Sequence, residues 1–152
     1  MNGTDDLYQQ MILDHNKHPR NFAELNEQTT HQAEGFNPLC GDHYHIYARL
    51  NEAGVIEAVT FKGTGCAISK ASASMMTEAV IGKTEAEAKA LFEQFHRLVI
   101  GELTVEEAPR ELGKLAVFAG VCKFPSRVKC AALCWHTLQG ALNQEGEPVS
   151  NE

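Results

Sequence analysis

The sequence predicts an α+β fold, in which a small antiparallel β-sheet of about three strands is covered on one face by about five helices. Two observations lead to this fold class. Strand patterns are confined to the first part of the chain, and helical patterns with capping signals dominate after the second strand. The length of 152 residues fits one domain. We therefore expect residues 1–152 to form a single domain, with a frayed polar tail from about residue 144.

The first part of the chain contains one helix and a hairpin. Apolar side chains recur at helical spacing over residues 5–16, which indicates a helix, and Pro19 disfavours its continuation. Residues 44–50 alternate in the period of two that is typical of a strand, and residues 55–61 form a second β-rich run. A turn joins the two runs, so we expect an antiparallel hairpin. The position of a third strand is left open.

Helical signals dominate the rest of the chain. A helix from about residue 68 ends before Gly82, a usual residue just past a helix end. Thr84 and Glu87 form a capping box that opens the next helix, and a second box at 104–107 is weakened by Pro109. A short helix around 111–119 and a longer one from about 126 to 142 complete the prediction.

Charge and composition exclude several classes of function. The chain carries 13 Lys and Arg against 20 Asp and Glu, a net charge of −7, whereas nucleic-acid binders carry clustered positive charge. No apolar run approaches the roughly 18 residues of a membrane span. The first residues lack the basic start and apolar stretch of a signal peptide. We therefore expect a cytoplasmic protein with no nucleic-acid or membrane partner.

Five cysteines in a reducing compartment favour metal ligands, reactive thiols or core filler over disulfides. Three of them mark the ends of predicted elements. Cys40 and Asp42 lie in the turn before the first strand, and Cys66 lies at the start of the helix after the second strand. Cys130 lies in the first turn predicted for the last long helix, near Arg127. Thiols at helix N-termini have a lowered pKa.

A hairpin returns the end of its second strand to the side where its first strand began, so Cys40, Asp42 and Cys66 can meet. If Cys130 joins them, three thiolates and one carboxylate form a tetrahedral set that suits Zn²⁺. A carboxylate ligand indicates a site that exchanges its ligands. The alternatives are that each cysteine is a small buried hydrophobe and that Asp42 only stabilises its turn.

The other two cysteines lie on apolar stripes. We expect Cys122 and Cys134 to pack in the core, although Cys134 follows Cys130 by one helical turn and could reach the same site. His43 and His45 point to the same face of their strand, where a surface role is favoured. His15, His18 and His31 belong to no evident cluster.

Three segments carry a family resemblance when taken together. They are 37–42, with Cys40 and Asp42; 63–69, with Cys66; and 127–131, with Cys130. With the opening Tyr8, Ile12 and 18–21 they resemble the U-type iron–sulfur cluster assembly family from about residue 7 to 142. Two departures from the ISC-type scaffold indicate the SUF-type branch: Lys129 replaces the histidine before the third cysteine, and extra residues lie around 100–114.

The resemblance implies a function. Members of the SUF-type branch bind zinc through residues that correspond to Cys40, Asp42, Cys66 and Cys130. They act as sulfurtransferases that accept persulfide sulfur from a SUF-type cysteine desulfurase, a pyridoxal-phosphate enzyme, and serve downstream iron–sulfur assembly proteins. Cys40 is our expected sulfur acceptor because it lies in a glycine-containing turn, and Arg127 would support it by holding the desulfurase.

Two alternatives remain at this point. The same ligands could build a transient [2Fe–2S] cluster that a scaffold hands to apo-proteins. A purely structural zinc module that binds a protein is the third reading, and Asp42 argues against it.

Overall fold

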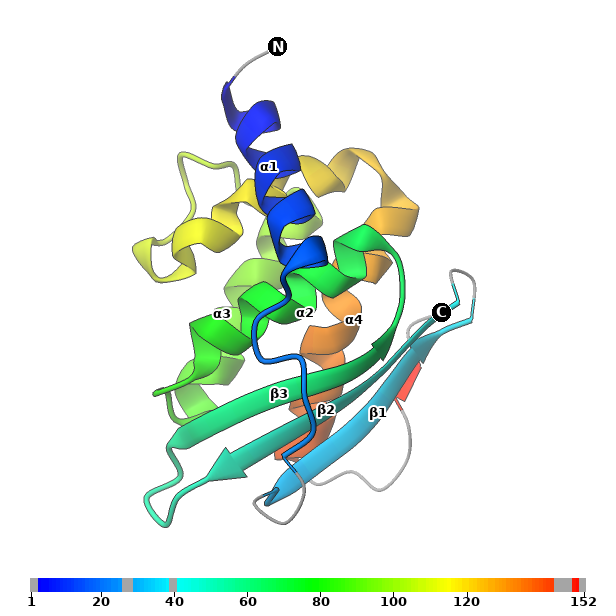
Figure 1. Cartoon of the computed structure of the whole chain (residues 1–152). Helices are drawn as coiled ribbons and strands as arrows, with labels where there is room; N and C mark the ends of the chain where they lie inside the picture. The colour runs from blue at the N-terminus through cyan, green and yellow to red at the C-terminus, as the bar shows by residue number, and fades with distance from the viewer. Residues whose placement is uncertain (1–2, 26–28, 39–40, 144–148, 151–152) are drawn as a thin grey trace.

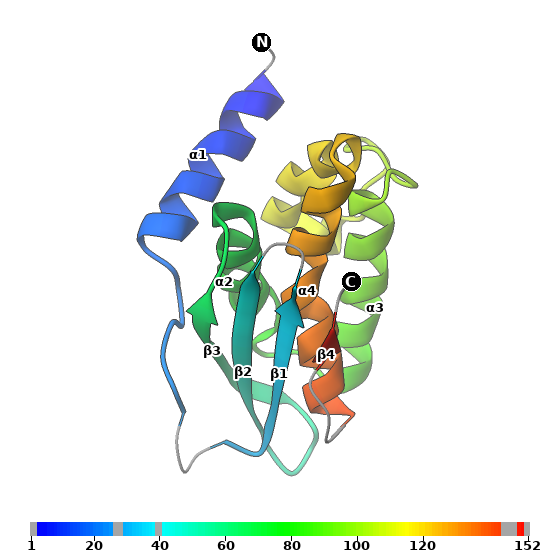
Figure 2. The ribbon, with the colours of Figure 1, turned by 90° about the vertical axis from the view of Figure 1, so that its right-hand side faces the viewer.

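The computed structural model describes residues 3–25, 29–38, 41–143 and 149–150. Its helices lie on one face of a sheet, with α2 (Ala67–Val80) and α4 (Pro125–Leu142) against the strands (Figure 1). The helix α1 (Gly3–Lys17) packs on α2, and α3 (Glu85–Val99) packs on α4 and on the helical segment η2 (Arg110–Lys123). In the turned view, α3 and α4 lie to the right of β1, β2 and β3, and α1 lies above β3 (Figure 2). The predicted α+β class is confirmed.

The sheet has the strand order β3-β2-β1-β4. The strands β1 (His31–Asn37), β2 (Asp42–Leu50) and β3 (Ile56–Thr64) are antiparallel, and the two-residue β4 (Val149–Ser150) pairs parallel to β1. The predicted hairpin is therefore confirmed as β2 and β3. The strand β1 has no predicted counterpart, because its sequence contains no β-branched residue, and its buried positions are Ala33, Gly35 and Asn37.

The helices follow their predicted boundaries closely. They are α1 (Gly3–Lys17), α2 (Ala67–Val80), α3 (Glu85–Val99) and α4 (Pro125–Leu142). Gly82 after α2 has a φ of 92°, the left-handed conformation that favours glycine. Thr84 and Glu87 make both hydrogen bonds of the capping box. Thr104 and Glu107 make the same bonds, but no helix follows, since Pro109 comes too soon.

The predicted short helix is the 3-10 segment η2 (Arg110–Lys123), which is interrupted at Gly113 with φ 51° and ψ −126°. Two close approaches hold α4 in place. The hydroxyl of Ser72 on α2 donates to the carbonyl of Ala131 on α4 at 2.6 Å. A Cβ at Gly35 would collide with the side chain of Thr137, so only glycine lets β1 lie this close to α4.

The core fills the space between the sheet and the helices. Trp135 of α4 stacks on Phe95 of α3, with ring centroids 4.8 Å apart. The largest fully buried side chains of the core also include Tyr44 and Phe61 from the sheet and Phe118 from η2. Among the described residues, no helix combines the length and the apolar character needed to cross a membrane.

Candidate metal centre

Asp42, Cys66 and Cys130 converge at one end of the sheet. One carboxylate oxygen and two sulfurs all lie within 4.8 Å of one another. Asp42 opens β2, Cys66 precedes α2, and Cys130 lies on α4. The pairing of His43 with Thr64 explains part of this convergence, because it brings the start of β2 beside the end of β3. Among the described residues, this is the group of ligating side chains that could hold a metal ion.

Cys66 is the N-cap of α2. Its sulfur accepts the backbone N–H of Ser69 at 3.4 Å, and its own backbone N–H donates to Oδ1 of Asp42 at 2.9 Å. A hydrogen bond with Cys130 is the main cause that lowers the pKa of Cys66 to about 6, and Ser69 contributes while partial burial opposes the shift. Cys66 is therefore mostly thiolate at neutral pH, and the residue is accessible to solvent.

Asp42 supplies a buried oxygen that lacks a partner. The residue is 1% exposed, and Oδ2 has no hydrogen-bond partner among the described residues. A buried carboxylate oxygen without a partner carries a large desolvation cost. A cation held by the Asp42 carboxylate and the two sulfurs would remove that cost. The residues present therefore fit a metal ion, and a donor set with two thiolates suits Zn²⁺.

Two hydroxyls support this group from behind. Ser69 donates to the carbonyl of Cys66 at 3.0 Å, and the Tyr44 hydroxyl lies 2.9 Å from the same Ser69 oxygen. Because the Ser69 proton is engaged, Tyr44 is the donor, and burial raises the pKa of Tyr44 so that it stays protonated. A Cβ at Gly65 would press on Tyr44, Ser69 and Asp42 at once. Sequence reasoning missed both hydroxyls, although each lies two or three residues from a predicted ligand.

The other predicted site residues have different outcomes. Cys40 lies outside the described residues. The prediction that Cys130 occupies the first helical turn is wrong, because α4 begins at Pro125 and Cys130 is in the second turn; proline is favoured at the first helical position. Arg127 is exposed and places its guanidinium 4.7 Å from the ring centroid of Phe124.

The two other cysteines behave differently from each other. Cys134 is fully buried, and burial is the main cause that raises its pKa, with the negative charges of Asp42 and Cys66 adding to it. It packs in the core as expected and is not among the three grouped ligands. The prediction that Cys122 packs in the core is wrong, since its side chain is exposed beside Gly101. The apolar run that contains Cys122 belongs to a 3-10 segment, whose three-residue turn shifts which positions face inward.

His43 and His45 lie on the sheet face that no helix covers. His43 pairs with Glu34 at 3.0 Å, and His45 pairs with Gln32 at 2.9 Å. Both rings therefore point to the same face, as expected, and away from Asp42. A hollow of ≈ 450 Å³ opens beside Asp42 and is also lined by Phe36 and Pro38.

Comparison with known proteins connects this geometry to relatives. The family model described as the NifU-like N-terminal domain matches residues 7–131. The iron–sulfur cluster assembly scaffold protein IscU of Streptococcus pyogenes serotype M1 is 41% identical over 138 residues, which cover 91% of this chain and 84% of that protein. The zinc-dependent sulfurtransferase SufU of Bacillus subtilis (strain 168) is 39% identical over 143 residues, which cover 93% of this chain and 94% of that protein.

Solved structures share the fold. A candidate iron–sulfur cluster assembly scaffold for the SUF system from Fervidobacterium islandicum AW-1 superposes with a TM-score of 0.80 at 34% identity, over 92% of this chain and 99% of that one. The N-terminal part of a NifU-like protein from Brucella abortus gives a TM-score of 0.78 at 24% identity, over 92% and 94% of the two chains. The second likeness concerns the fold alone.

Proposed function

Since this chain belongs to the NifU-like N-terminal domain family of iron–sulfur cluster assembly proteins, we propose that it is a zinc-dependent sulfur acceptor. It takes persulfide sulfur from a SUF-type cysteine desulfurase and passes it to downstream iron–sulfur assembly proteins. The observation that carries the proposal is the buried Oδ2 of Asp42, which has no hydrogen-bond partner among the described residues and belongs to the residue grouped with Cys66 and Cys130.

The proposed ligands are Cys40, Asp42, Cys66 and Cys130. Three of them are supported by the grouping of their ligand atoms within 4.8 Å, and Cys40 follows from its place two residues before Asp42. When bound, zinc would hold the thiols as thiolates and protect them from oxidation. The name of the Bacillus subtilis relative, a zinc-dependent sulfurtransferase, supports this choice of metal.

The transfer step is a thiolate–persulfide exchange. The Cys40 thiolate attacks the outer sulfur of the desulfurase persulfide, a new S–S bond forms on Cys40, and the desulfurase cysteine leaves as a thiolate. No oxidant or reductant is needed, because the sulfane sulfur moves without a net change of electrons. Arg127, which is exposed near the start of α4, would contact the desulfurase and support the transfer.

The test is desulfurase turnover with and without this protein. We expect the wild-type chain to stimulate the release of alanine from L-cysteine by the desulfurase. Stimulation by the Cys40→Ala variant should be at least about tenfold weaker, which is equivalent to about 1.4 kcal/mol. The matched control is Cys122→Ala, which removes an exposed thiol outside the grouped ligands. Full stimulation by Cys40→Ala would overturn the assignment of Cys40 as the acceptor.

A cluster scaffold is the second candidate, and the name of the Streptococcus pyogenes relative favours it. Lys129, in place of the histidine before the third cysteine in ISC-type scaffolds, favours transfer instead. Metal content of protein isolated without oxygen separates the two. Stoichiometric zinc with stimulated turnover supports transfer, whereas iron with acid-labile sulfide and no stimulation supports the scaffold.

A further inference from the structure

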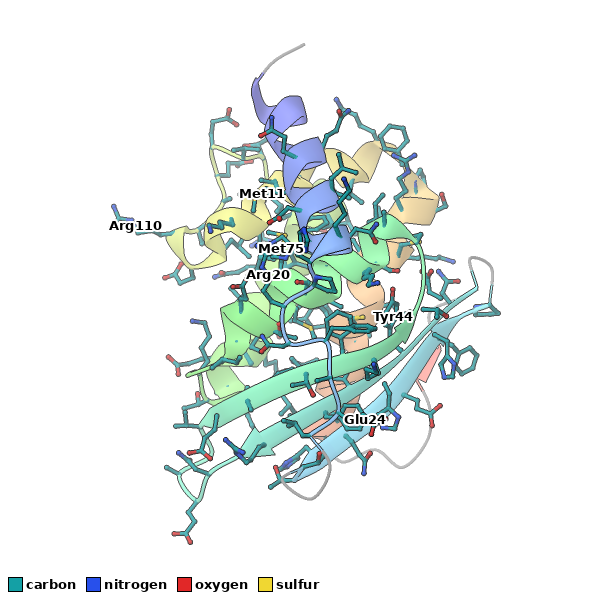
Figure 3. All side chains as sticks on the ribbon, in the orientation of Figure 1. Met11, Arg20, Glu24, Tyr44, Met75 and Arg110 are labelled. Carbon is teal, nitrogen blue, oxygen red and sulfur yellow. The ribbon has the colours of Figure 1, made fainter. Side chains whose placement is uncertain are left out.

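A second pocket lies between α1, α2 and η2, away from the metal centre. It has a volume of ≈ 330 Å³ and is lined by ten residues from three elements and the loop after α2, among them His15, Glu78, Lys83, Glu111 and Lys114. Glu78 follows Cys66 by twelve residues along α2, which is about 18 Å at the helical rise. In Figure 3, Met75 of this pocket lies under α1, and Tyr44 of the metal centre lies lower, by the sheet.

His15 is the buried polar group of the pocket. The residue is 4% exposed, and its Nδ1 lies 2.7 Å from Oγ of Ser74. That oxygen also accepts the backbone N–H of Arg20 at 2.8 Å. Since a hydroxyl oxygen accepts up to two hydrogen bonds, the Ser74–Nδ1 bond is compatible with either neutral tautomer of the ring. Burial, with the charge of Arg20 adding to it, lowers the pKa of His15, so the ring is neutral at pH 7.

The Nε2 atom of His15 lies 3.9 Å from a carboxylate oxygen of Glu78, which is too long for a hydrogen bond. The neighbours Ser74 and Glu78 come from a helix that is distant in the sequence, so no local pattern around His15 reveals them. A polar ring atom at a pocket is a position for a hydrogen bond to a ligand.

The charged side chains around the pocket are not neutralised by one another. Glu78 and Glu111 supply two carboxylates, and Lys83 and Lys114 supply two ammonium groups. Across the described residues, none of these four has an ion pair within 4.0 Å other than the His15–Glu78 contact. A ligand with a single charge would be attracted by either the two carboxylates or the two ammonium groups and repelled by the other two groups.

The remaining walls are apolar or bare. Met75, Leu112 and Leu115 are buried side chains at the pocket. Gly113 adds backbone with a φ of 51°, and no atom lies within 4 Å of the place where a Cβ would be. The interruption of η2 at Gly113 therefore leaves open space where a regular helix would carry a side chain.

We propose that this pocket binds a free α-amino acid with an apolar side chain. The ligand would be a zwitterion, whose ammonium group meets the carboxylates of Glu78 and Glu111 and whose carboxylate meets the ammonium groups of Lys83 and Lys114. The Nε2 atom of His15 makes a further hydrogen bond, and the apolar wall contacts the ligand side chain. This inference goes beyond the proposed sulfur transfer and does not depend on it.

Calorimetry on the full chain tests the proposal with L-leucine as the probe. We expect saturable binding of L-leucine, and at least about tenfold weaker binding of N-acetyl-L-leucine and of L-leucinamide, each of which lacks one of the two charges. Equal binding of the blocked analogues, or no saturable binding of L-leucine at millimolar concentration, would overturn the proposal.

Variants locate the binding. Glu78→Gln and Lys114→Gln alter exposed side chains and should each weaken L-leucine binding at least about tenfold, whereas Glu93→Gln, exposed on α3 outside the pocket, should leave it unchanged. Binding should persist in metal-free Cys66→Ser protein. Loss of binding there would show that L-leucine chelates the site metal, and it would overturn the assignment to this pocket.

Discussion

The backbone N–H of Cys66 donates to Oδ1 of Asp42 across 2.9 Å. The start of α2 thus fixes one oxygen of a carboxylate that is grouped with two sulfurs, and it leaves Oδ2 buried with no hydrogen-bond partner in the described chain. One side chain therefore both joins β2 to α2 and supplies a candidate metal ligand.

The Asp42→Asn substitution separates these two roles. The amide keeps an oxygen for the N–H of Cys66 but removes the negative charge, so we expect zinc affinity to fall by at least about 10–100-fold. Competition with a chromogenic chelator measures the affinity. Asp14→Asn, an exposed carboxylate paired with Arg20 at 2.7 Å, is the control and should keep the wild-type affinity. Unchanged zinc affinity in Asp42→Asn would exclude Asp42 as a ligand.

Gly65 leaves no room for a methyl group. A Cβ there would lie within 3.0 Å of Tyr44, Ser69 and Asp42, so Gly65→Ala should destabilise the fold by about 1–3 kcal/mol and weaken metal binding. Urea denaturation measures the free energy of unfolding. Gly120→Ala, where nothing lies within 4 Å, should show no such loss. Equal stability of the two variants would contradict the packing at Gly65.

Metal removal should weaken the fold without abolishing it. The core extends through both layers, from Ile46 to Trp135, so the metal-free chain should still unfold cooperatively. Metal at 100–1,000 times its Kd stabilises by about 2.7–4.1 kcal/mol, which corresponds to a Tm decrease of about 5–15 °C on removal for a domain of this size. Differential scanning calorimetry before and after chelation measures it. A chelated chain without a thermal transition would contradict this expectation.

Two imidazoles, the buried His15 and the half-buried His136, make stability depend on pH. Burial is the main cause that lowers the pKa of His15 and of His136, with Arg20 and His96 adding to it respectively. The unfolded chain then binds more protons than the folded chain as pH falls below about 6.5, so the free energy of unfolding decreases there. Denaturation at pH 7.5 and 5.5 measures the decrease. The decrease in the free energy of unfolding between pH 7.5 and 5.5 should be smaller in His136→Gln than in the wild type. An equal decrease in the two proteins would show that His136 does not contribute to the pH dependence.

Regular local patterns predicted most of the fold, and long-range pairing decided the rest. The capping box at Thr84 and the end of α2 at Gly82 needed only neighbours in sequence, and both were predicted. The strand β1 owes its existence to partners on β2 and to the close approach of Gly35 to Thr137, which no pattern within 31–37 reveals.

The site shows the same division. The grouping of Asp42, Cys66 and Cys130 could be predicted. The hairpin and the starts of the helices have recognisable sequence patterns, and these patterns indicate which elements end near one another. The hydroxyls of Tyr44 and Ser69 were missed, since their role depends on a bond between β2 and α2. Cys122 was misplaced because a 3-10 segment replaced the expected helix, and the pocket at His15 depends on Ser74, 59 residues later.

The bond from Ser72 to the carbonyl of Ala131 ties α2 to α4 without using either sulfur. The spacing between Cys66 and Cys130 is therefore set by the protein scaffold before any ion arrives. If an ion binds here, exchange of one ligand would require no rearrangement of the core, because the two helices are already tied together. The fold thus presents a preformed group of ligands rather than one that an ion must assemble.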